Sequence, residues 1–242
     1  MNTKSFKFLM TAFLAIGASG VWAGEGSASI ESSAVLGIKR RANVDAGATV
    51  VISVPWLGAD GQAIKVQDLI AKDCLSKDDE LHIWNGTTYD AWKWSGSAWE
   101  AFETSTGATP TMQSVARGKA AWFKRAEAGS VIQIGLYNED AITTTPEKGD
   151  GIFRAKHSLL INPKSEATAL SKIGGADGDQ IVILTSPKVR LERVGGKWGI
   201  VKNVFNPSTF ITEKQFTEYA NAIPADTGFW YISAGGAPAI QW

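Results

Sequence analysis

The chain has 242 residues, 44% of them hydrophobic, and it carries 24 basic and 24 acidic residues. A chain without net basic charge is poorly suited to sequence-independent phosphate binding, which argues against nucleic acid as a partner. The sequence contains one cysteine, which excludes an intramolecular disulfide, so burial must stabilise the fold. The 25 glycines and the short, regularly spaced apolar runs favour β structure.

Residues 1–23 have the order of a secretory signal peptide. Lys4 and Lys7 precede an apolar run from Phe8 to Gly17, and Ala23 ends a cleavage site of small residues. We therefore expect a mature chain that starts at Gly24 and is periplasmic, outer-surface or extracellular. No later apolar run approaches the roughly 18–20 residues of a membrane span, so we expect no integral membrane segment in the mature chain.

Three blocks of sequence occur twice, in the same order along the chain, and this predicts an internal duplication. The pairs are "VISVP" (51–55) with "LLINP" (159–163), "DELHIW" (79–84) with "DQIVIL" (179–184), and "VARGKAAWF" (115–123) with "IPADTGFWY" (223–231).

Each copy is predicted to contain a strand ending in proline, a short helix, a strand, a hairpin, a strand with a G-x-W-like pattern and a final strand. The short helices are expected at Val66–Asp73 in the first copy and at Thr212–Ala222 in the second, where Thr212 is a suitable N-cap. The predicted fold is mainly β, with two tandem, internally duplicated β-rich modules, sandwich or barrel-like, each with a short helix.

The duplication also predicts the domain organisation. After the signal peptide, residues 24–137 form the first β-module, the polar segment 138–151 is a linker, and residues 152–242 form the second β-module. Whether the modules stay separate or pair into one body, and the oligomeric state of the protein, are open at this point.

Comparison of the two copies indicates which aromatic residues are structural. A position that is apolar in both copies is predicted to lie in the core. These positions are Trp84, Tyr89, Ala91, Trp94, Trp99, Trp122 and Phe123.

Two tryptophans break this pattern. In the second copy Trp92 is matched by Glu192 and Trp56 by Lys164, which suggests that both rings face water. Exposed aromatic rings can stack on sugars or dock on proteins, so Trp92 and Trp56, with Tyr89 as a support, are the possible ligand-binding residues. The alternative is that the copies pack differently and both rings are covered.

Motifs for catalysis are not found in the sequence. His82 and His157 stand apart, and zinc, acyl-transfer and dinucleotide-binding patterns are missing. We therefore predict no catalytic, cofactor-binding or metal-binding residues and no cofactor. The acidic clusters 77–80 and 177–179 could supply calcium ligands, but aspartates before a strand more often serve turns.

Two segments carry a resemblance to a known group of proteins. The segments are "SAVLGIKRRANVDAGATVVISVPW" (33–56) and "IPADTGFWY" (223–231). They resemble uncharacterised secreted bacterial β-module proteins with a closing G-x-G-F-[FWY]-[FYW]-type strand motif. Ile38 departs from the aromatic residue of that pattern, and Ala120 stands where the second copy has Gly228. The resemblance implies export and a scaffold role, with no catalytic residues to transfer.

These observations together favour a non-catalytic exported protein. We expect a cell-surface or periplasmic scaffold or adhesion module that acts through protein contacts. The alternative is a glycan-binding protein that uses exposed tryptophans, and an enzyme acting on extracellular polysaccharide is the third hypothesis. The expected partner is thus a protein or a glycan at the cell surface.

Overall fold

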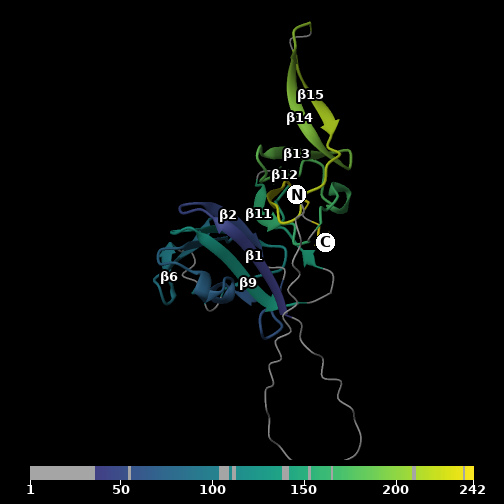
Figure 1. Cartoon of the computed structure of the whole chain (residues 1–242). Coiled ribbons are helices and arrows are strands. Elements are labelled where there is room, and N and C mark those ends of the chain that lie inside the picture. Colours follow the sequence, from purple (N-terminus) through teal and green to yellow (C-terminus); the bar gives the residue numbers. More distant parts are fainter. Residues whose placement is uncertain are drawn as a thin grey trace, which may run out of the picture. The chain divides into compact units, whose positions relative to one another are not determined.

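The computed structural model describes residues 36–53, 56–103, 109–110, 113–137, 142–151, 154–164, 166–208, 211–236 and 238–242. Residues Ala34–Trp242 form one compact unit (Figure 1). The predicted signal peptide, residues 1–23, lies outside the described residues. We refer below to residues 36–137 as the N-terminal half and to residues 142–242 as the C-terminal half.

Strands make up most of the regular structure, which confirms that the fold is mainly β. The strands of the N-terminal half are β1 (Leu36–Val44), β2 (Thr49–Ser53), β3 (Ile64–Lys65), β4 (Glu80–Trp84), β5 (Tyr89–Trp94), β6 (Trp99–Glu103), β7 (Ser114–Val115), β8 (Ala120–Lys124) and β9 (Gly129–Leu136). Those of the C-terminal half are β10 (Thr143–Thr144), β11 (Lys156–Ile161), β12 (Gln180–Ile183), β13 (Val189–Val194), β14 (Lys197–Asn206), β15 (Ile211–Glu218), β16 (Gly228–Ser233) and β17 (Ile240–Gln241).

The two larger sheets have matching strand orders. The N-terminal half has a five-stranded sheet of order β2-β8-β4-β5-β6, and the C-terminal half a six-stranded sheet of order β11-β16-β12-β13-β14-β15. The N-terminal half also has two two-stranded sheets, the β1-β9 ribbon and β3-β7, and the C-terminal half has one, the β10-β17 ribbon. Taken in order, each strand of the first sheet has a counterpart in the second, and β15 is the additional strand.

Each large sheet buries one of its faces in a core of its own, because apolar residues alternate along its strands. Leu81, Ile83 and Phe123 lie in the N-terminal core, and Ile181, Ile183 and Tyr231 lie in the C-terminal core. Trp99 and Trp198 are buried, one in each core. Both therefore lie inside, as the repeat predicted. The other predicted core residues are either buried (Ala91, Trp94, Phe123) or half-buried (Trp84, Tyr89, Trp122).

A third apolar cluster joins the opposite faces of the two sheets, and we call it the junction. It contains Val51, Ala120, Leu159 and Ile161, with Trp84, Trp122, Leu184 and Trp230 packed against them. Four of its members come from each half. The backbone also crosses the junction, where the Ile161 N–H donates to the Gly118 carbonyl at 3.1 Å.

The predicted helix at Thr212–Ala222 is wrong, since most of this segment belongs to strand β15. β15 pairs with β14 over eight residue pairs, from Gly199 opposite Glu218 to Asn206 opposite Ile211. Figure 1 shows the two strands running together as a hairpin. Pairing to a neighbouring strand has overridden a local sequence preference for helix.

The predicted helix at Val66–Asp73 is also not an α-helix. The segment holds two short 3₁₀ turns, η1 (Val66–Asp68) and η2 (Lys72–Cys74), and the C-terminal half has a similar turn, η3 (Leu170–Lys172). Among the described residues, no helix is long and apolar enough to cross a membrane.

Candidate functional site

Trp92 was predicted to be exposed, and this prediction is wrong. Its side chain has 0% exposure and lies in the N-terminal core, where it pairs across the sheet with Leu81. A ring buried in this way has no face free to stack on a ligand.

The reason for the error is a shift of one residue between the two halves. Trp92 lies opposite Leu81, and Leu191 lies opposite Ile181, so the structural counterpart of Trp92 is Leu191 rather than Glu192. A one-residue shift moves every side chain of a strand to the other face.

The shift arises in the first hairpin of each sheet. Ile83 pairs with Asp90 across six residues (84–89), whereas the equivalent Ile183 pairs with Val189 across five (184–188), so this hairpin is one residue shorter in the C-terminal half. The comparison of the two sequence copies therefore matches equivalent residues up to β4 and β12, but along β5 and β13 it is wrong by one residue.

Trp56 is half-buried and holds the β1-β9 ribbon. A Cβ added at Gly37 would lie 2.5 Å from the Trp56 ring, and one added at Gly135 would lie 2.4 Å from the Trp56 Cβ. Both positions therefore need glycine for Trp56 to pack this close to the ribbon. Tyr137 packs at 5.9 Å from the Trp56 ring. The Trp56 Nε1 is buried and has no hydrogen-bond partner among the described residues.

Tyr89 is half-buried beside the junction. Its hydroxyl accepts a hydrogen bond of 3.1 Å from Trp122 Nε1, and its ring meets the edge of Trp84 at 5.1 Å. Burial raises the pKa of the Tyr89 hydroxyl, and the bond from Trp122 opposes this shift. Tyr89 therefore lies on the opposite face of the sheet from Trp92, and the three predicted site residues do not form one site.

Trp84 occupies the centre of the aromatic contacts at the junction. Its ring lies edge-on to Trp230 of the other half at 5.5 Å, and its Nε1 donates to the His157 carbonyl at 2.7 Å. Trp84 is therefore held by contacts to both halves.

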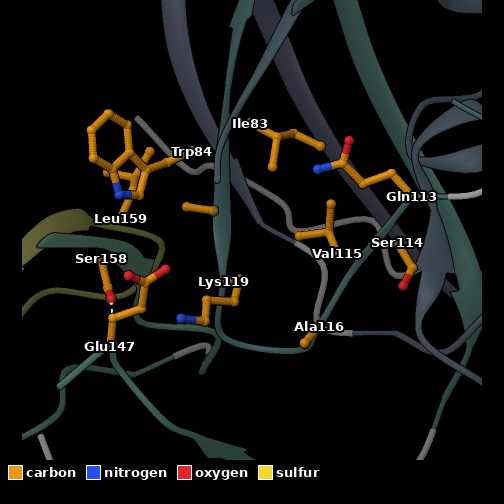
Figure 2. A pocket seen from close by; sticks show the side chains of 11 residues that line it. Ile83, Trp84, Gln113, Ser114, Val115, Ala116, Lys119, Glu147, Ser158 and Leu159 are labelled. Atoms are coloured by element: carbon orange, nitrogen blue, oxygen red, sulfur yellow. Dashed lines mark hydrogen bonds between the residues drawn. The ribbon is translucent and has the colours of Figure 1, made fainter. Parts of the chain in front are cut away.

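A pocket of about 190 Å³ opens next to Trp84, between the two halves. Figure 2 shows Lys119 and Glu147 on the same side of the pocket as Trp84, with Gln113 on the other side. Its apolar wall includes Ile83, Trp84, Val115 and Leu159, and its polar wall includes Gln113, Ser114, Lys119, Glu147 and Ser158.

The polar groups of the pocket are positioned by the backbone around them. The Glu147 N–H donates to Ser158 Oγ at 2.8 Å, which fixes Glu147 against β11. The backbone of Lys119 forms an isolated antiparallel β-bridge with Leu160 of β11. Burial lowers the pKa of the Lys119 amine, while the nearby Glu147 carboxylate opposes that shift.

Gln113 supplies an unsatisfied acceptor. Its Oε1 is buried and has no partner among the described residues, while its Nε2 donates to Asp90 Oδ2 at 3.4 Å. Unpartnered buried polar atoms are uncommon in folded proteins.

Sequence reasoning missed all the polar residues of this pocket. Lys119 had one usable signal, since it is matched by the uncharged Thr227 in the comparison of the two sequence blocks. Glu147 lies in the segment predicted as a linker, and nothing in its local sequence marks it.

The acidic clusters 77–80 and 177–179 act in turns. Asp79 Oδ2 accepts the Ser76 N–H at 2.9 Å, and Asp179 Oδ2 accepts the Ala176 N–H at the same distance. In the part of the chain that the structure describes, no three His, Cys, Asp or Glu side chains are grouped so that they could hold a metal ion.

Comparisons with protein-family models, with curated proteins and with solved structures found no match to this chain.

Proposed function

We propose that this is an exported, non-catalytic protein that acts at the cell surface or in the periplasm through contacts with another protein. The observation that carries the proposal is the outward face of the β1-β9 ribbon, where large apolar side chains are exposed.

Ile38 and Ile134 lie directly opposite one another in the ribbon and are 65% and 42% exposed. Tyr137, just after β9, is 47% exposed. Exposed apolar residues that are grouped on one element mark interaction surfaces more often than isolated ones do.

The charge of the ribbon indicates the kind of partner. β1 carries Lys39, Arg40 and Arg41 and contains no acidic residue. Arg40 is exposed and shares the alternating face of Ile38, whereas Lys39 points to the other face and contacts Asp226. An apolar protein segment with carboxylates beside its apolar residues would therefore complement this face.

The ribbon also offers a backbone edge. Among the described strands β1 pairs with β9, so it lies at the edge of a two-stranded sheet. An unpaired strand edge can accept an extended segment of another protein. The proposed partner is thus an acidic, extended protein segment.

Two further statements belong to this proposal. Export rests on the signal-like residues 1–23, and mass spectrometry of the secreted protein should find an N-terminus at Gly24. An intact N-terminus on the secreted protein would contradict it.

The second statement is that the two halves arose by duplication. It is supported by the matching strand orders and by the equivalent registers of β2 with β8 and β11 with β16, in which Val51 opposes Trp122 and Leu159 opposes Trp230.

Site-specific photocrosslinking in the exporting cell tests the protein-contact proposal. A benzophenone amino acid replaces Ile38 on the ribbon or, as a matched control, Val194, which is 40% exposed on the other half. We expect one discrete protein adduct at position 38, none at position 194, and loss of the adduct in an Arg40→Glu background. Equal labelling at both positions, or an adduct that is insensitive to Arg40→Glu, would overturn the proposal.

A further inference from the structure

We propose that the pocket between the halves is a binding site for one saccharide unit. Its volume of about 190 Å³ is the space of about six water molecules. It is below the range of about 300–1,000 Å³ that is typical of sites for drug-sized ligands, so a small ligand fits it best.

The walls of the pocket match the two kinds of surface that a sugar ring presents. Trp84 and Leu159 form an apolar wall for the C–H face of a ring. The indole of Trp84 is fixed in place, because its Nε1 is bonded to the His157 carbonyl at 2.7 Å and its ring is packed against Trp230. A fixed aromatic wall loses little freedom when a ligand binds.

The polar wall combines hydrogen-bond donors and acceptors. Gln113 Oε1 is a buried acceptor without a partner among the described residues, and Glu147 carries two carboxylate oxygens. Within the described residues, the Lys119 amine has no hydrogen bond or ion pair, so its protons can be donated to a ligand. A hydroxyl group can donate to the acceptors and accept from the amine, which makes a polyhydroxyl ligand suitable.

The charges of the pocket favour a neutral ligand. Lys119 supplies one cation and Glu147 one anion, and the Glu147 carboxylate is close enough to act on the pKa of Lys119. The two charges offset each other, so the pocket does not attract a ligand of either net charge.

The pocket is also a departure from the symmetry of the two halves. The counterpart of Trp84 is Leu184 and that of Lys119 is Thr227, so the C-terminal half lacks both the aromatic ring and the cation. The residues that suit a sugar therefore occur once, on a framework that is otherwise repeated.

Calorimetric and tryptophan-fluorescence titrations of the mature protein test this site. The probes are glucose, galactose, mannose and N-acetylglucosamine, with alanine as an amino-acid probe that carries both an ammonium and a carboxylate. We expect one saccharide to bind with a Kd of about 1 mM.

Matched variants locate the binding. Gln113→Ala and Lys119→Met should each weaken the affinity by about tenfold, because each removes a hydrogen bond to the ligand. Lys124→Met is the control, since Lys124 is exposed on the same strand segment and does not line the pocket. It should leave the affinity unchanged. If Lys119→Met lowers the melting temperature, Gln113→Ala gives the decisive comparison.

The proposal fails if none of the four saccharides binds, if alanine binds in their place, or if the control weakens binding as much as the pocket variants do. Photocrosslinking at Ile38 reports on the β1-β9 ribbon, whereas the saccharide titrations report on the pocket. Either proposal can therefore fail without the other.

Discussion

Asp79 and Asp179 are buried carboxylates that have the same surroundings in the two halves. Asp79 Oδ1 accepts the Ala126 N–H and Asp179 Oδ1 accepts the Ala234 N–H, both at 2.8 Å. Besides its two backbone N–H partners, each carboxylate has a side-chain partner, and this side chain differs between the halves. Asp79 is paired with the buried guanidinium of Arg125 at 2.7 Å, whereas Asp179 accepts a bond from the Tyr231 hydroxyl at 2.7 Å.

This difference predicts unequal costs for two comparable substitutions. Arg125→Met removes the cation from a buried ion pair and should lower the free energy of unfolding by about 3–5 kcal/mol. Tyr231→Phe removes one hydrogen bond to a carboxylate and should cost about 1.5–3 kcal/mol. Urea denaturation of both variants measures the costs, and a larger loss for Tyr231→Phe would contradict the assignment.

Tyr231 should also make the stability depend on pH in the alkaline range. Burial, followed by the bond to Asp179, raises the pKa of its hydroxyl above the usual value of about 10. Above pH 10 the unfolded chain releases this proton while the folded protein retains it, so the unfolded state is favoured as the pH rises. The contribution of Tyr231 is therefore complete below about pH 10 and is lost progressively as the pH rises above that value.

Thermal unfolding from pH 8 to pH 11 tests this effect. The wild type should lose stability above pH 10 more steeply than Tyr231→Phe does. Parallel curves for the two proteins would show that Tyr231 does not contribute.

At the level of elements, the β14-β15 hairpin depends on close contact at a glycine. A Cβ at Gly199 would be 2.4 Å from the Phe216 ring and 2.4 Å from the Thr217 carbonyl oxygen. Gly199→Ala should therefore separate the strands locally and speed amide exchange along β15 by about tenfold, with the two cores unaffected. Lys202→Ala, an exposed change on the same strand, is the control for this hydrogen-exchange measurement. Unchanged exchange in Gly199→Ala would contradict the strand assignment of residues 211–218.

The elements differ in how well their sequences predict them. β4 and β12 could be predicted because Leu81 and Ile83, like Ile181 and Ile183, alternate with polar or less buried positions. β15 could not, since its residues are mostly exposed and its strand conformation depends on pairing with β14.

The candidate site was harder to predict than the strands. Trp92 was assigned to the wrong face of β5. The matched sequence blocks did not show which loop is one residue longer in the N-terminal half, and the position of that extra residue determines which side chains of β5 face the core. The pocket brings together Gln113, Glu147 and Ser158 from three separate segments, so its residues share no spacing in the sequence.

At the level of the whole molecule, the two halves meet through corresponding positions. Val51 of the N-terminal half faces Gly228 of the C-terminal half, and their counterparts Leu159 and Ala120 belong to the same cluster. This is the arrangement of a symmetric dimer interface, here formed within one chain. The account therefore requires that the halves unfold together.

Differential scanning calorimetry of the wild type and of Gly228→Leu tests this requirement most directly. A Cβ at Gly228 would be 2.8 Å from Val51 Cγ1, so a leucine should force the halves apart. We predict one cooperative transition for the wild type and two for Gly228→Leu, while the control Ile232→Leu on the same strand keeps one. Two transitions in the wild type, or an unchanged single transition in Gly228→Leu, would contradict the account.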